Sequence, residues 1–161
     1  MKRLICVVIA LVIFVSASGC GKQEASIAKP VNFYYKTNPE KYQSAAITPE
    51  VRESKDFEND LAGLLQLYLT GPLSEDFTNP FPEGLEIISV KVNNSNVQLQ
   101  LNANLALLSD TRMSIACACL TLTTLELAQR NRIVITALDE SGNILYTASM
   151  TKDQILLNDT N

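Results

Sequence analysis

The chain has 161 residues, with 13 lysines and arginines against 17 aspartates and glutamates, and its formal net charge is −4. An acidic chain lacks the basic surface that non-specific nucleic-acid binding requires, so nucleic acid is not an expected partner. The sequence contains neither histidine nor tryptophan. The missing histidine excludes Ser-His and Cys-His nucleophile pairs, histidine general bases and histidine metal sites.

The N-terminus has the pattern of an export signal. Lys2 and Arg3 form a short basic start, and the uncharged apolar run Leu4–Val15 follows. A run of this length suits a signal peptide and is too short to span a bilayer as a helix, which takes about 20 apolar residues. Small residues then lead to a cysteine in the tetrad Ala17–Cys20 (ASGC). This order predicts that residues 1–19 are a signal peptide.

The tetrad resembles the lipobox of bacterial lipoproteins, in which the cysteine is acylated and the peptide bond before it is cut. It departs slightly from the commonest form, since Ala17 stands where leucine is more usual. The resemblance implies lipid on Cys20 and a location on the extracytoplasmic face of the cell membrane. Two acyl chains give stable anchoring. Residues 20–30 would then form a lipidated tether, and the alternative is a plain cleaved signal in which Cys20 is incidental.

A folded domain is expected over residues 31–150, and it begins with a strand. Val31–Tyr35 is aromatic and β-prone, which predicts strand structure. Residues 36–53 are polar and contain two prolines. We therefore expect a loop there, with a helical turn starting at Thr48-Pro49 as an option.

A first helix is predicted over residues 55–70. Its apolar side chains recur at helical spacing and form one face, which comprises Phe57, Leu61, Leu64, Leu65 and Tyr68. Ser54 or Asp56 can cap the start of this helix, and Gly71-Pro72 ends it. Residues 72–84 contain several prolines and are expected to form an ordered loop.

A β-hairpin follows, formed by residues 85–92 and 97–103. Asparagine and serine fill the turn between them, as is typical of turns. The second segment alternates apolar and polar residues, so Leu99 and Leu101 should face the core while Gln98 and its polar neighbours face solvent.

The sequence predicts a second helix over residues 109–128 that is apolar on nearly all sides. Such a helix is buried on two sides or meets a partner. Cys117 and Cys119 lie two positions apart on it, so on a helix they point in different directions and are not placed to bond each other or to share a metal. We expect both to be small buried residues.

The last predicted elements are a second hairpin and a tail. Residues 132–138 and 144–150 flank the turn Asp139–Asn143, and residues 151–161 form a polar tail that is expected to fray. The element order is then β-α-β-β-α-β-β. We predict the α+β class, with an antiparallel sheet of about five strands and two helices on one of its faces.

These segments resemble the GerMN domain, the sporulation and germination module of bacterial lipoproteins. The resemblance runs from Leu69-Thr70-Gly71-Pro72 through the Pro82-Glu83-Gly84 turn, the alternating hairpin Leu85–Asn102 and the turn Asp139–Gly142. It covers residues 31–150 and implies a binding or assembly module related in shape to the ring-building domains of envelope machines. In double-domain members the module occurs twice, whereas this chain has room for one. No catalytic residues are implied.

Any enzymatic site would have to use carboxylates, hydroxyls, lysines or tyrosines. The candidate carboxylates are Glu75, Asp76, Glu83 and Glu86, which could serve glycoside hydrolysis only at a defined spacing across a cleft. A solvated acidic loop is the expected alternative. That loop lacks the spacing of an EF-hand calcium site. Three tyrosines could stack on sugar rings, although packing at the core or its rim is favoured: Tyr34, Tyr35 and Tyr42.

The sequence therefore predicts a non-catalytic, membrane-anchored envelope lipoprotein that needs no cofactor or metal. It would bind a protein partner or itself, in sporulation or germination. The alternative is a peptidoglycan ligand binder or weak wall hydrolase that uses the Tyr34-Tyr35 region and the acidic loop. A substrate-binding lipoprotein for transport is a third hypothesis, but residues 20–161 are too few for the usual two-lobed clamp.

Overall fold

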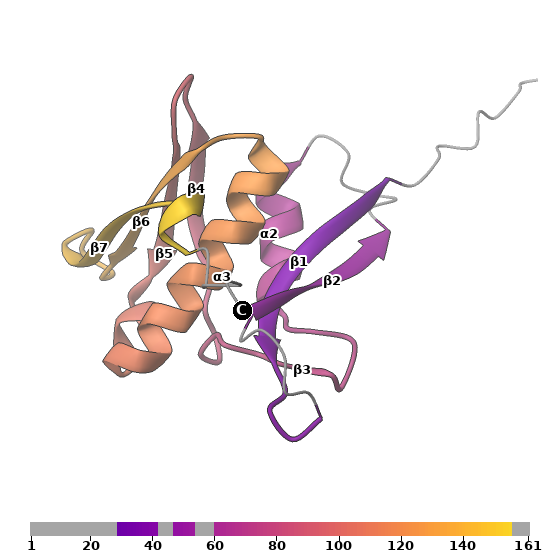
Figure 1. The fold of residues 1–161 in the computed structure, drawn as a ribbon. Coiled ribbons are helices and arrows are strands. Elements are labelled where there is room, and N and C mark those ends of the chain that lie inside the picture. Colours follow the sequence, from indigo (N-terminus) through magenta and orange to yellow (C-terminus); the bar gives the residue numbers. More distant parts are fainter. Residues whose placement is uncertain (1–28, 42–46, 54–59, 156–161) are drawn as a thin grey trace, which may run out of the picture.

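The computed structural model describes residues 29–41, 47–53 and 60–155. Two sheets enclose a central layer of helices (Figure 1). The three-stranded sheet has the order β2-β1-β3 and comprises β1 (Pro30–Thr37), β2 (Ile47–Glu53) and β3 (Phe77–Thr78). The four-stranded sheet has the order β4-β5-β6-β7 and comprises β4 (Ile87–Val92), β5 (Val97–Asn102), β6 (Arg132–Leu138) and β7 (Ile144–Thr151).

The helical layer contains α2 (Leu61–Leu69) and α3 (Asp110–Ala128). The short 3-10 helix η1 (Ala103–Leu107) leads into α3, and η2 (Lys152–Gln154) follows β7. No helix among the described residues is both long and apolar enough to cross a membrane.

The predicted α+β class is confirmed, and the strands are divided differently from the expectation. They form two sheets on opposite sides of the helices, where one sheet with helices on a single face was predicted. The pairing of β5 with β6 is parallel, whereas the other pairs are antiparallel. The cause is α3, because a long helical crossover returns the chain to the same end of the sheet and lets the next strand run parallel.

The strand β2 lies within residues 36–53, where the sequence predicts a loop. It pairs antiparallel with β1, and Pro49 stands opposite Tyr34. An edge strand tolerates proline because its outer N–H is not needed in the ladder. The prediction failed because a strand with a proline and three charged side chains does not resemble a buried strand.

The helix α2 begins at Leu61 after its cap Asp60, whose Oδ1 accepts a hydrogen bond from the N–H of Gly63 at 2.9 Å. This start is later than the predicted residue 55, and the predicted caps Ser54 and Asp56 lie outside the described residues. The helix ends before Gly71, which has a φ of 101°. Glycine accommodates that left-handed conformation without strain.

The second predicted helix is confirmed as α3, and its all-round apolar character is explained by its position. It contacts β1 of one sheet and β5 and β6 of the other. The predicted burial of Cys117 and Cys119 is also confirmed, with exposed fractions of 1% and 0%. Both thiols are free. A partner is therefore not needed to cover this helix.

The predicted alternation of β5 is confirmed. Val97, Leu99 and Leu101 are fully buried, while Gln98 between them is exposed. The domain continues past residue 150, because Thr151 and Gln154 form a capping box and Ile155 is buried. The rest of the predicted tail lies outside the described residues.

Candidate functional site

An acidic groove lies at the end of the four-stranded sheet where β5 and β6 finish. It consists of two adjoining pockets of about 510 and 450 Å³, which share Gly84 and Glu86. We define the acidic groove by its four carboxylates, which are Glu83, Glu86, Asp139 and Glu140.

One wall of the groove contains Glu83 and Glu86. Hydrogen bonds from side chains at and just after the end of β5 fix this wall in place. The side-chain amides of Asn102 and Asn104 each donate to the carbonyl oxygen of Gly84 at 2.8 Å. Gly84 has a φ of +69°, and a Cβ added there would lie 3.0 Å from Nδ2 of Asn104. The left-handed φ therefore favours glycine, and a side chain at this position would press on the Asn104 amide. The Pro-Glu-Gly turn seen in the sequence is therefore clamped to the sheet.

The turn between β6 and β7 forms the opposite wall. Asp139 accepts hydrogen bonds from the backbone N–H groups of Ser141 and Asn143 at 2.9 and 2.8 Å, and from the side-chain amide of Asn143 at 2.8 Å. The hydrogen bonds from Asn143 are the main cause that lowers the pKa of Asp139 below its usual 3.8. This carboxylate is therefore ionised at neutral pH, next to the exposed Glu140.

Exposed apolar side chains lie at the same end of the sheet. The register of β4 shifts between Ile87 and Ser89, and Ile88 at this shift is 52% exposed. A second shift, between β6 and β7, accompanies Ile144 and Leu145, which are 66% and 50% exposed. Bulges of this kind redirect side chains at sheet margins. The acidic groove thus combines negative charge with accessible apolar surface.

The structure separates the carboxylates that the sequence groups together. Glu83 and Glu86 line the acidic groove. Glu75 and Asp76 instead lie 3.1 and 3.9 Å from Nζ of Lys41, near β3, and the side chain of Glu75 is 93% exposed. The sequence missed the contribution of Asp139 and Glu140, although the turn that carries them was predicted correctly.

Of the tyrosines proposed as a sugar platform, Tyr34 and Tyr35 are engaged in contacts within the domain. Tyr35 is fully buried. The hydroxyl of Tyr34 donates to Glu126 at 2.7 Å, and burial is the main cause that raises its pKa to about 12. Tyr42 and the lipid-attachment candidate Cys20 lie outside the described residues.

A buried ion pair between Glu50 and Arg52 was also missed. Glu50 accepts hydrogen bonds from the backbone N–H groups of Leu73 and Ser74 at 2.9 and 2.8 Å, and Arg52 donates to the carbonyl oxygen of Gly71 at 2.7 Å. Both side chains are less than a tenth exposed. Because these partners fix the loop after α2, the pair is structural. Its signal was the Glu-x-Arg spacing, which places both side chains on one face of a strand.

Within the acidic groove, Asp139 does not have the raised pKa that a general acid uses, because its carboxyl pKa is shifted the opposite way. No group of three or more potential metal ligands occurs within the described ranges. Open carboxylates beside apolar side chains are complementary to a basic segment that also carries apolar residues.

Comparisons with known proteins agree with this fold. The family model named Germane, described as sporulation and spore germination, matches residues 32–140, and the chain belongs to this family. A search of curated proteins found no match.

Two solved structures from Bacillus subtilis share the fold. The tandem GerMN domains of the sporulation protein GerM match with a TM-score of 0.56 and 16% identity, over 84% of this chain and 50% of that one. The first GerMN domain of GerM matches with a TM-score of 0.56 and 11% identity, over 68% of this chain and 82% of that one. This chain therefore spans about half of the tandem structure.

Proposed function

We propose that this Germane-family protein is a non-catalytic envelope lipoprotein that binds protein partners during sporulation or germination. Family membership supports the setting, because its description is sporulation and spore germination. The signal-like N-terminus and the tetrad ending in Cys20 support anchoring on the extracytoplasmic face of the membrane.

The acidic groove is the observation that supports partner binding. Three of its carboxylates, Glu86, Asp139 and Glu140, line an open depression together with Ile88 and Leu138. Such a surface attracts a basic segment by charge and retains it by burying apolar side chains. Burial of a side chain such as Ile88 contributes roughly 25 cal/mol per Å².

Site-specific photocrosslinking in living cells tests this proposal. A photoreactive residue in place of Ile88 should give a discrete crosslinked protein product. The matched control is the same residue in place of Leu73, which is also exposed but lies in the loop after α2. Charge reversal by E86K and E140K together should abolish the Ile88 product. The equivalent reversal E75K, outside the groove, should not.

Two outcomes would contradict the partner proposal. Equal crosslinking from positions 88 and 73 would show that partners do not bind the acidic groove in preference to the rest of the surface. Cleavage of purified peptidoglycan by the protein, or its saturable retention on peptidoglycan, would favour the wall-binding alternative.

Anchoring needs a separate test, because it rests on residues outside those described. Cys20→Ala should move the protein from the membrane fraction to the soluble fraction, or leave the signal peptide uncleaved. Mass spectrometry of the native chain should show an acylated Cys20 as its first residue. Unchanged fractionation of a Cys20→Ala variant whose signal peptide has been cleaved, or an unacylated start of the native chain, would refute the lipoprotein assignment.

A further inference from the structure

The edges of the two sheets differ in how they are protected, and this points to an interaction surface. An exposed strand edge presents backbone donors and acceptors to any other strand, and proteins block such edges with charges, prolines, short strands or covering elements. The outer edge strand of the three-stranded sheet is β2, which carries Pro49 and the charged residues Glu50, Arg52 and Glu53. Its other edge strand, β3, has two residues.

Side chains from the helices cover two further stretches of edge. The backbone N–H of Tyr34, beyond the short β3, donates to Oγ1 of Thr123 in α3 at 2.9 Å. The N–H of Ile87 in β4 donates to Oε1 of Gln66 in α2 at 3.1 Å. The edge strand β4 also carries Lys91 on its exposed side.

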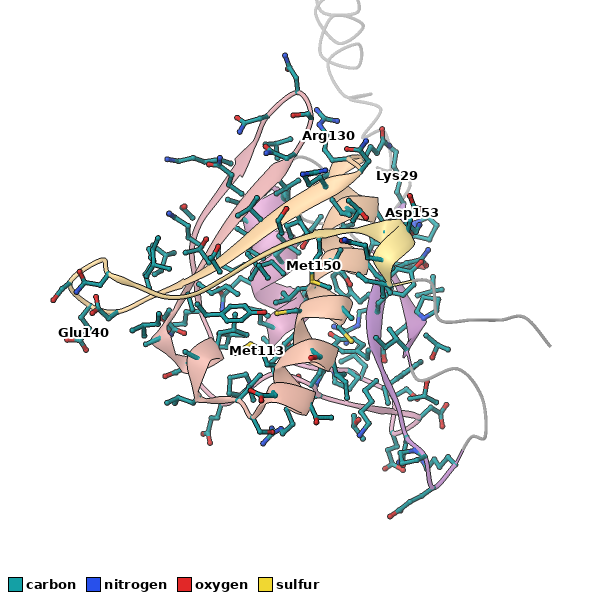
Figure 2. The ribbon with its side chains drawn as sticks, turned by 60° about the vertical axis from the view of Figure 1, so that its left-hand side comes forward. Lys29, Met113, Arg130, Glu140, Met150 and Asp153 are labelled. Carbon is teal, nitrogen blue, oxygen red and sulfur yellow. The ribbon has the colours of Figure 1, made fainter. Side chains whose placement is uncertain are left out.

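The edge strand β7 lacks these protections among the described residues. Its eight residues (ILYTASMT) contain no charge and no proline, and among the strands of the described ranges it pairs with β6 alone. In Figure 2, β7 runs along the margin of the sheet, from the turn at Glu140 to Asp153. Its irregularity is confined to the register shift near its start, so Tyr146–Thr151 pairs regularly with β6.

We propose that β7 pairs antiparallel with β7 of a second copy of this chain. The proposal names a partner for the binding module and so rests on the proposed function. A two-fold axis perpendicular to the sheet, near Thr147 or Ala148, joins the two four-stranded sheets into one. The α3 side of both copies then stays on the same face, because opposite residues in antiparallel strands point to the same side.

Complementary charges at the two ends of β7 favour a second copy, although the chain as a whole is acidic. The chain is acidic, with a formal net charge of −4, so two copies repel each other unless they approach through an uncharged surface such as β7. Antiparallel pairing also brings Lys152 at the end of one β7 toward the turn at the start of the other. That turn carries Asp139 and Glu140, which complement the lysine.

The expected interface is small, so we expect it to form only where copies are concentrated on a membrane. Pairing of one short strand on each side buries less than the roughly 1,200 Å² of a stable interface, so the free association is weak. Copies held on one membrane surface meet at a higher effective concentration, which favours weak pairing. The pair should therefore form on membranes and dissociate on dilution in detergent.

Cysteine crosslinking of the full-length chain in native membranes tests the proposal. In T147C, the two introduced thiols would lie one strand spacing apart with a small stagger, within roughly 10 Å, and a short bismaleimide should give a dimer. In the control Q98C, on the exposed side of β5, the two thiols would be separated by five strand spacings, about 24 Å, and should give none. The native Cys117 and Cys119 are buried, so wild type should also give none.

A second variant places a charge on the edge strand β7. T147C/S149K should lose dimer by roughly fivefold or more, because each copy would carry a lysine on the edge strand close to the two-fold axis, whereas T147C/S149T should keep it. Thermal melting followed by circular dichroism would verify that both variants fold. Equal dimer from T147C and Q98C, or dimer that survives S149K in a folded protein, overturns the proposal.

The outcomes also separate this inference from the proposed function. If T147C stays monomeric while the Ile88 photocrosslink to another protein persists, pairing through β7 is refuted and the binding module stands. If T147C crosslinks to a different protein and not to itself, the second-copy assignment is refuted. If neither T147C nor Ile88 gives any product, both proposals fail.

Discussion

The two sheets cover the same helical layer with cores of different kinds. The four-stranded sheet buries aliphatic side chains such as Leu99, Leu101 and Ile135, which are fully excluded from solvent. The three-stranded sheet buries aromatic rings: Tyr68 of α2 lies 5.2 Å from Phe33 and 4.9 Å from Tyr35, measured between ring centroids.

Buried polar groups on the side of the three-stranded sheet, which we call the aromatic side, need hydrogen-bond partners. The side of the four-stranded sheet, which we call the aliphatic side, buries apolar side chains on its sheet face and avoids this requirement. The hydroxyl of Tyr35 donates to the carbonyl oxygen of Tyr68 at 2.8 Å, and that of Tyr68 donates to the carbonyl oxygen of Tyr34. The guanidinium of Arg52 lies 5.1 Å from the centre of the Phe33 ring and pairs with Glu50. The difference indicates that one sheet depends mainly on apolar burial and the other on a satisfied polar network as well.

The largest expected effect comes from placing a charge in the aliphatic core. Leu101→Asp should unfold the domain, because Leu101 is fully buried and an unpaired buried charge costs about 4 kcal/mol or more. Gln98→Asp, on the exposed side of the same strand, should change the free energy of unfolding by less than about 0.5 kcal/mol. Urea denaturation followed by circular dichroism measures both. A stably folded Leu101→Asp protein would contradict the assigned strand face.

The next effect tests the polar network. Arg52→Ala should destabilise the domain by about 3 kcal/mol, since it leaves Glu50 buried without its cation. The control Lys41→Ala removes exposed ion pairs to Glu75 and Asp76 and should cost less than about 1 kcal/mol. A double variant, Glu50→Leu with Arg52→Met, should be much less damaging than the sum of the single changes. Equal losses in Arg52→Ala and Lys41→Ala would show that the network is dispensable.

The same contrast explains how far the sequence predicts this molecule. Apolar periodicity identified α3 and the alternation of β5, because both bury aliphatic side chains at a regular spacing. It missed β2, where the inward-facing side chains are those of Glu50 and Arg52, each less than a tenth exposed, while Pro49 and Val51 are exposed. Charged side chains become buried only through partners such as the Ser74 backbone, and those contacts exist only once the chain has folded.

The candidate site shows the same limit. The turn that carries Asp139 was predicted from local turn chemistry, which depends on neighbouring residues, and the turn that carries Glu83 was predicted from the family resemblance. That these turns meet in one groove was not predicted. Their proximity follows from the parallel pairing of β5 and β6, which brings the ends of both strands to the same edge, and this pairing depends on the crossover through α3.

Alkaline pH should disturb the aromatic side more than the aliphatic side. Burial, as the main cause, raises the pKa of Tyr34 from 10.0 to about 12 and that of Tyr35 and Tyr68 further. These tyrosines hold their protons longer in the folded chain than in the unfolded one. Their contribution to stability is thus complete below pH 10 and is lost as the pH rises through about 12 and beyond.

Tyrosinate absorbance and circular dichroism, recorded together during an alkaline titration, measure this loss. The folded signal should fall as the buried tyrosines ionise. Tyr146, which faces α3 from the four-stranded sheet, also has a pKa raised to about 12 by burial. It should therefore titrate with them once the domain opens. Ionisation of every tyrosine near pH 10 in a protein that stays folded would contradict the predicted burial.

The smallest expected effects come from two Tyr→Phe changes, one on each side of α3. Tyr34→Phe removes a hydrogen bond of 2.7 Å to the Glu126 carboxylate and should cost about 1.5 kcal/mol, since bonds to charged groups are the stronger ones. Tyr146→Phe removes a contact of 3.6 Å with the sulfur of Cys117. That loss should cost less than about 0.5 kcal/mol, because a thiol is a weak hydrogen-bonding partner.

These two variants remove the same hydroxyl oxygen and keep the same ring. The difference between their free energies of unfolding therefore reports the contribution of the hydrogen-bond partner. Urea denaturation of Tyr34→Phe, Tyr146→Phe and wild type, with Glu126→Gln as a third variant, measures it. Glu126→Gln should weaken the Tyr34 bond without deleting it, and it should also weaken the bond that Glu126 accepts from the side-chain amide of Asn32, so its cost should exceed that of Tyr146→Phe. Equal costs for both Tyr→Phe changes would mean that the aromatic side depends on burial alone, as the aliphatic side does, and that its hydrogen bonds contribute no net stability.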